Sequence, residues 1–129
     1  MRRRGRGTRA DAGQSTVELA LVLPLVVALL LVVIQVGLVV RDQILVVHAA
    51  REAVRAASVG DTDDQVRQVA TRAGPLEADR LTVLVRRQPG TPPTVGVHVT
   101  YRCPTDLPLV GGLVPDVDLE ADAVMAQEG

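Results

Sequence analysis

The residues best suited to chemistry lie between a basic leader and a long apolar run, in the sequence Gly13-Gln14-Ser15-Thr16-Val17-Glu18. Glycine has no side chain, so a membrane-embedded peptidase would meet a flexible, unhindered backbone at Gly13. Cleavage there would free the amine of Gln14 and make Glu18 the fifth residue of the mature chain. The apolar run would stay attached, whereas the shorter apolar core of an ordinary secretory signal is removed. We therefore predict a processing site at Gly13 and Gln14.

Glu18 places a carboxylate at the edge of an apolar helix, where an unpaired charge is costly. Insertion scales give about 2.5–3.5 kcal/mol for a charge at the bilayer centre, and less near the interface. The freed amine of Gln14 on a neighbouring subunit would pair with this carboxylate. Because an unpaired buried charge is penalised far more than a paired one, the pair would set the stagger between packed helices. Alternatively, Glu18 marks the cytoplasmic end of a membrane anchor and extends into the lipid headgroups.

The remaining polar residues form no pattern typical of an enzyme. His48 and His98 are far apart, and neither has Cys or acidic neighbours at the spacing of metal ligands. We expect both imidazoles to be solvated. Ser58 lies near Gly60 but has no nucleophile elbow around it. We therefore expect no catalytic residue, no metal and no cofactor.

Two further features have a structural and a functional interpretation. Acids at every second position favour the solvated face of a strand over a calcium site, whose ligands must surround one ion. Cys103 is the single cysteine, so it forms no internal disulfide. A small, partly buried residue is favoured there over an intermolecular bridge or a lipidation site. The alternating acids are Asp116, Asp118, Glu120 and Asp122.

The element that positions Gly13 and Glu18 is an apolar segment long enough to cross a bilayer. Residues 19–40 carry no charge, and about 20 helical residues span the hydrocarbon core. Pro24 removes one backbone donor and is expected to kink or loosen the helix without ending it. We predict a transmembrane helix over residues 14–40.

Charge is divided unevenly along the chain. Residues 1–13 hold five arginines against Asp11, a net charge of +4, and residues 14–129 hold nine arginines against 14 acids, a net charge of −5. Arginines before an apolar span place the N-terminus in the cytoplasm and the rest outside the membrane. We expect residues 1–13 to be a disordered basic leader. A nucleic-acid contact is the weaker interpretation, because the adjoining span explains the arginines more simply.

Residues 41–129 are expected to form a small extracytoplasmic domain that begins with a helix continuation over 41–59. Gly60 is the expected C-cap of that helix. Thr62 would cap a short helix that ends near Gly74-Pro75. The continuation carries a polar stripe of His48, Arg51, Glu52 and Arg55, which either contacts another subunit or is ordinary surface, and an apolar face of Val47, Ala50, Val54 and Ala57.

Alternation of apolar and polar residues predicts strands over 81–86, 95–101 and 116–123, with a hairpin loop at 88–93. In the last strand Val117, Leu119, Ala121 and Ala123 would face the core. The domain has no Trp or Phe and one Tyr, so its core must be thin. The expected fold class is α+β and pilin-like: a long N-terminal helix, transmembrane in its first half and amphipathic in its exported half, packed by a small antiparallel sheet.

The chain resembles the TadE-like family, pilin-like minor components of tight-adherence (Flp-type) pilus systems. The resemblance rests on GQSTVELALVLPLVVALLLVVIQVG at 13–37, HAAREAVRAA at 48–57 and DLEADAVMAQE at 118–128. It implies cleavage after Gly13 by a prepilin peptidase, an assembly role for Glu18 and Pro24, and a place in pilus biogenesis, adhesion or secretion. Leu19 departs from the pattern, which often has an aromatic residue there, and the large outer domain favours a minor component over a major pilin.

Two hypotheses remain open. The first is a processed pilus component whose partners are a prepilin peptidase, other pilin-like subunits, the assembly platform and membrane lipid, with no nucleic acid. The second is an unprocessed single-span anchor whose outer domain binds a protein. Both predict one span with a cytoplasmic N-terminus, and they differ at Gly13.

Overall fold

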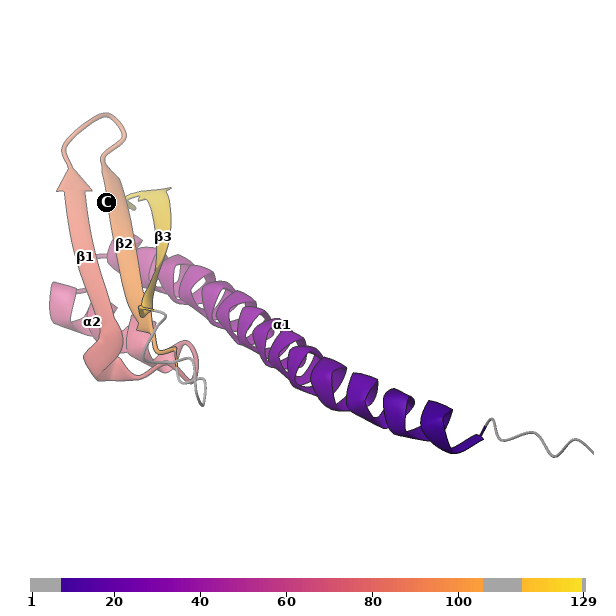
Figure 1. Cartoon of the computed structure of the whole chain (residues 1–129). Helices are drawn as coiled ribbons and strands as arrows, with labels where there is room; N and C mark the ends of the chain where they lie inside the picture. The colour runs from indigo at the N-terminus through magenta and orange to yellow at the C-terminus, as the bar shows by residue number, and fades with distance from the viewer. Residues whose placement is uncertain (1–7, 106–114, 129) are drawn as a thin grey trace, which may run out of the picture. The chain divides into compact units, whose positions relative to one another are not determined.

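The structure, a computed structural model, describes residues 8–105 and 115–128. The chain divides into two units, residues 1–36 and 37–129, and we describe each by itself. Its elements are α1 (Thr8–Ser58), α2 (Asp63–Arg72), the 3-10 helix η1 (Ala78–Arg80), β1 (Leu81–Gln88), β2 (Thr94–Cys103) and β3 (Val117–Ala126). Figure 1 labels the two α-helices and the three strands.

The first unit consists of the beginning of α1, which starts earlier than the sequence predicted. The prediction of disorder before Gln14 is wrong for residues 8–13, because the helix begins at Thr8. Alanine and arginine are strong helix formers, and a helix already nucleated in the apolar run extends at little cost. The rest of the predicted leader, residues 1–7, lies outside the described residues. The helix continues through Pro24, as predicted, while a kink there stays a prediction.

The second unit begins with the C-terminal part of α1, which ends as the sequence indicated. Gly60 has φ +97°, and its amide donates to the Ala57 carbonyl while the amide of Asp61 donates to that of Ala56. These two bonds form a Schellman motif, in which a glycine takes the left-handed conformation after the last turn. Thr62 and Gln65 then form the predicted capping box of α2.

The sheet is antiparallel in the order β1-β2-β3, with Val83 opposite Val99 and Val99 opposite Ala121. The predicted hairpin between β1 and β2 is confirmed. Side chains alternate between a buried inner face and an exposed outer face, as the sequence predicted. On the inner face of β3, Val117 near the start and Met125 near the end remain 38% and 42% exposed.

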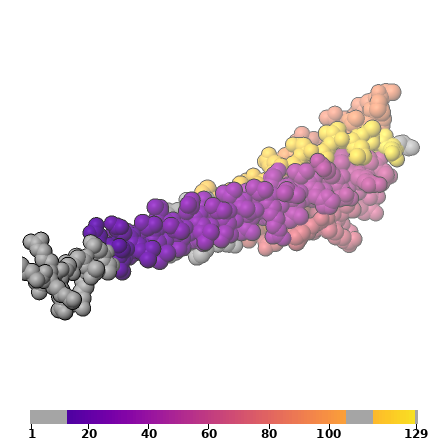
Figure 2. Space-filling model, turned by 90° about the vertical axis from the view of Figure 1, so that its right-hand side faces the viewer, coloured from indigo at the N-terminus to yellow at the C-terminus, as the bar shows by residue number. Residues whose placement is uncertain are grey.

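The core forms where the second part of α1 packs against the inner face of the sheet. Val97 and Val99 on β2 are buried together with Val46, and α2 adds Val66 and Ala70. Figure 2 shows β3 (yellow) beside the later part of α1. The same contact appears where the Gln43 side chain donates to the Glu120 carbonyl and the Glu128 amide donates to the Ser58 carbonyl. The α+β class, with a long N-terminal helix and a small antiparallel sheet, is confirmed.

Candidate processing and assembly site

Gly13 and Gln14 lie within α1, on fully accessible backbone. Both residues are exposed, and a Cβ built on Gly13 would meet nothing within 4 Å. A helical peptide bond must open before a peptidase can engage it. Glycine is about 1 kcal/mol less favourable than alanine in a helix, so Gly13 lowers the cost of opening the helix at this bond. The geometry leaves this bond reachable for an enzyme that approaches along the helix.

Glu18 is exposed on the same helix, four residues after Gln14. Residues at this spacing lie on one face of a helix. The amine that cleavage would expose and the carboxylate of Glu18 therefore share one face. None of the described residues forms an ion pair with Glu18, so the carboxylate has room for an ammonium from a neighbouring chain.

The helix around these residues is long and apolar enough to cross a membrane. From Gly13 onward it passes the length and composition criteria for a span, and none of its most apolar stretch is buried. Leu21 and Leu25 are 73% and 70% exposed. Water would penalise such a surface. A lipid environment removes the penalty, so the segment is a candidate membrane anchor.

Residues 13–55 match the family model described as TadE, TadE-like protein. This segment is similar to the TadE-like family. The match covers Gly13, Glu18, Pro24 and the amphipathic stretch that includes Arg51 and Arg55, so it confirms the resemblance for the N-terminal third of the chain. No curated protein and no solved structure matches the chain significantly. The family is one of pilus-associated, pilin-like proteins.

The two histidines differ from each other. His48 is exposed on α1, as predicted. The prediction that His98 is merely solvated is wrong, because its Nδ1 lies 2.7 Å from Asp122 Oδ1 and its Nε2 lies 3.2 Å from Thr100 Oγ1. The antiparallel register places His98 directly opposite Asp122, and this pairing across strands is not visible in the spacing along the chain.

The alternating acids occupy several different environments along β3 and the segment before it. Asp118 pairs with Arg102 at 3.5 Å, Asp122 pairs with His98, and Asp116 accepts from the Thr105 amide at 3.3 Å. No group of three or more potential metal ligands occurs within residues 8–105 and 115–128. The strand interpretation, with one face exposed, agrees with this arrangement.

Cys103 is a buried residue, in agreement with the structural interpretation. Its side chain is 3% exposed, and its Sγ lies 3.3 Å from Asp42 Oδ2 on α1. Burial, the hydrogen bond and the negative charge of Asp42 raise the pKa of the thiol to about 11. A protonated, buried thiol is a poor nucleophile. The contact with Asp42 was missed from the sequence, because nothing in the helical pattern distinguishes this carboxylate from a solvated one.

Proposed function

We propose that this chain is a TadE-type, pilin-like membrane component of a tight-adherence pilus assembly or secretion system, cleaved after Gly13 by a prepilin peptidase. The observation that carries the proposal is the match of residues 13–55 to the TadE-like family, which begins at Gly13. The exposed junction and the exposed apolar helix agree with it.

In the proposed mechanism the chain is first anchored by α1 with its N-terminus in the cytoplasm. The peptidase opens the helix at Gly13, removes the arginine-rich leader and leaves a new ammonium on Gln14. That ammonium pairs with Glu18 of a neighbouring subunit as the helices pack in lipid. Removing the leader also removes its net charge of +4, which would otherwise repel the leader of the next chain.

The N-terminus of membrane-extracted protein tests this proposal. We expect the mature chain to begin at Gln14 when the cognate peptidase is present, and Gly13→Val to retain the leader, because a branched side chain hinders the backbone. Gly37→Val is a matched control, since a Cβ on Gly37 also meets nothing within 4 Å in the same helix. Intact-mass measurement distinguishes the outcomes. Wild-type protein that keeps residues 1–13 beside an active peptidase would favour the second candidate, an unprocessed anchor with a protein-binding outer domain.

A further inference from the structure

The two edge strands of the outer domain carry opposite charge. β1 contains Arg86 and Arg87 and no acid, whereas β3 contains three acids and no base. The acids of β3 are Asp118, Glu120 and Asp122. Arg86 and Glu120 both point to the outer face, and within the described residues neither side chain has a partner. The sheet is therefore basic at one edge and acidic at the other.

The β3 edge offers unpaired backbone groups in a short window. Gln127, which directly follows β3, donates its amide to the Pro93 carbonyl before β2. In an antiparallel pair the direction of the backbone groups alternates along the strand. The backbone groups of odd-numbered β3 residues therefore point to β2, and those of even-numbered residues point to the free edge. Two of these even residues are bonded to α1, because Gln43 donates to the Glu120 carbonyl and the Glu128 amide donates to Ser58. Between these two contacts, the edge-facing backbone of residues 122–126 has no partner among the described residues.

A groove runs beside this window. It has a volume of about 570 Å³ and lies between α1 and β3. Val124 and Met125, at its rim, are 73% and 42% exposed. Arg51, Glu52 and Arg55 line its helical side, and Glu120 and Asp122 line its strand side. No described carboxylate forms an ion pair with either arginine. An unpaired, apolar-rimmed strand edge is a template for another strand.

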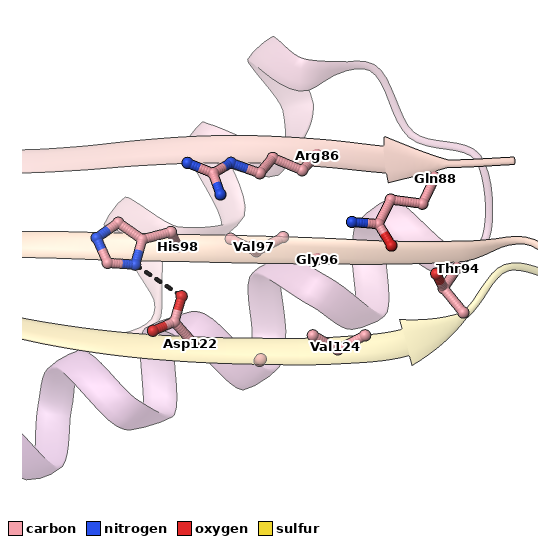
Figure 3. A pocket seen from close by; sticks show the side chains of 9 residues that line it. Arg86, Gln88, Thr94, Gly96, Val97, His98, Asp122 and Val124 are labelled. Atoms are coloured by element: carbon pink, nitrogen blue, oxygen red, sulfur yellow. Dashed lines mark hydrogen bonds and ion pairs between the residues drawn. The ribbon is translucent and has the colours of Figure 1, made fainter.

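The β1 edge also presents backbone groups that could pair with another strand. Even-numbered residues of β1 exchange backbone hydrogen bonds with even-numbered residues of β2. The backbone groups of the odd-numbered β1 residues therefore point away from β2, toward the free edge of the sheet. In a parallel pair, a residue whose backbone groups bond to the neighbouring strand lies level with a residue of that strand whose own backbone groups point away from the pair. Even residues of β3 would thus lie level with even residues of β1, and the outer faces of two sheets would coincide. Figure 3 shows Arg86 and Val124 on that outer face.

We propose that β3 of one subunit pairs in parallel with β1 of a second copy of this chain, so that the sheets join head to tail. Copies inserted in one membrane share one direction, and parallel pairing keeps the two α1 helices pointing the same way. An antiparallel pair of β3 strands would reverse one α1 relative to the other and would place acids near acids. The inference rests on the membrane orientation in the proposed function. A heterologous contact of this kind can repeat from subunit to subunit.

In the proposed pairing, the first turn of α2 in the second copy lies at the groove between α1 and β3. Arg87 binds Asp63, which places the acidic first turn of α2 near the end of β1. The bond from Glu128 to Ser58 places Arg55 near the corresponding end of β3. The Asp64 side chain is 88% exposed. The first turn of α2 in the second copy would therefore bring carboxylates to the unpaired arginines of the groove.

Cross-linking in the native membrane tests the pairing. One full-length copy carries Val124→Cys and the other carries Leu84→Cys, with different epitope tags, and a bifunctional maleimide joins nearby thiols. Arg86 is level with Val124 within one sheet. A second copy that lies beside β3 without a shift along the strands brings its Leu84 within two residues of Val124, an offset of about 7 Å. We expect cross-links between unlike copies to exceed those between like copies at least fivefold. Wild-type protein, whose Cys103 is buried, should give none.

Charge-reversal variants in the same cross-linking experiment test the role of the charged edges. Arg86→Glu in the Leu84→Cys copy should lower the yield at least threefold, and Asp122→Arg in the other copy should restore it. Arg72→Glu, an exposed arginine on α2, is the matched control and should change nothing. Dominant cross-links between two Val124→Cys copies, or no cross-link although both thiols react with a monofunctional maleimide, would overturn the proposal. The mature N-terminus is measured in the same samples. A retained leader contradicts the proposed function, whereas processed protein without unlike cross-links contradicts the pairing alone.

Discussion

At the scale of single residues, Gly13 and Glu18 are the positions on which the proposed function depends. They are exposed on one helix, and the match to TadE-like proteins includes both. Neither makes a contact within the described structure that would explain its identity by packing. Glycine in a helix and a carboxylate beside an apolar run each lower stability. The proposed role in processing and assembly would account for both costs.

The substitution Glu18→Ala should leave membrane insertion unchanged and abolish assembly, since the apolar span is intact while the ammonium of Gln14 loses its partner. Membrane fractionation and counts of surface filaments measure the two effects separately. Asp79→Ala removes an exposed acid from η1, outside both proposed contacts, and serves as the control, with insertion and assembly expected near wild-type levels. Normal filaments formed by Glu18→Ala would contradict the proposed pair between the Gln14 ammonium and the Glu18 carboxylate.

The buried thiol of Cys103 predicts a pH dependence. Its pKa rises from 9.0 to about 11 in the folded chain, so the folded state binds more protons than the unfolded state between these values. Stability contributed by the protonated thiol is therefore complete below pH 9 and is lost as pH rises toward 11. A shift of two units (11 − 9) corresponds to about 2.7 kcal/mol as an upper bound.

Denaturant unfolding of the detergent-solubilised chain at pH 8 and pH 11 measures this effect. Wild type should lose more stability over that range than Cys103→Ala, which lacks the titrating group. The difference between the two proteins isolates the thiol from every other group that titrates. Equal losses would show that the thiol has the same pKa in the folded and unfolded states.

At the scale of elements, α1 contacts the sheet through small side chains. Ala49, Ala53 and Ala57 are each fully buried at 0% exposure. Alanine allows a helix to lie close to a sheet of valines, and this close approach gives a domain without large aromatic residues a dense core. The sequence predicted an apolar face of Val47, Ala50, Val54 and Ala57, of which Ala50, Val54 and Ala57 are buried and Val47 is half-buried. The burial of Ala49 and Ala53 was missed.

Ala53→Leu tests this packing. Three additional carbons have no space at a fully buried position, so we expect a loss of about 1–3 kcal/mol in the free energy of unfolding. His48→Leu introduces the same side chain at an exposed position of the same helix and should change stability by less than about 0.5 kcal/mol. Thermal unfolding of both variants in detergent provides the comparison. A stable Ala53→Leu protein would mean that the helix can move away from the sheet at little cost.

At the scale of the whole molecule, the periodicities of the chain predicted most of the architecture. Period two along β1, β2 and β3 and helical period along α1 arise from local geometry and burial, so they are visible in the sequence. The start of α1 at Thr8 was missed, because helix propensity in residues 8–13 extends a nucleus that lies outside that segment. The η1 turn was missed as well, since three residues carry no periodic signal.

The sequence by itself determined the apolar run, the arginine-rich segment before it, the glycine and glutamate at their junction, and the alternating strands, because each is a pattern between near neighbours. Tertiary structure alone decided that His98 meets Asp122, that Asp42 meets Cys103, and that the sheet ends in one basic and one acidic edge. These contacts join residues 24 and 61 positions apart. Such pairs depend on strand register and on how α1 packs, which are properties of the folded domain and not of any local run of residues.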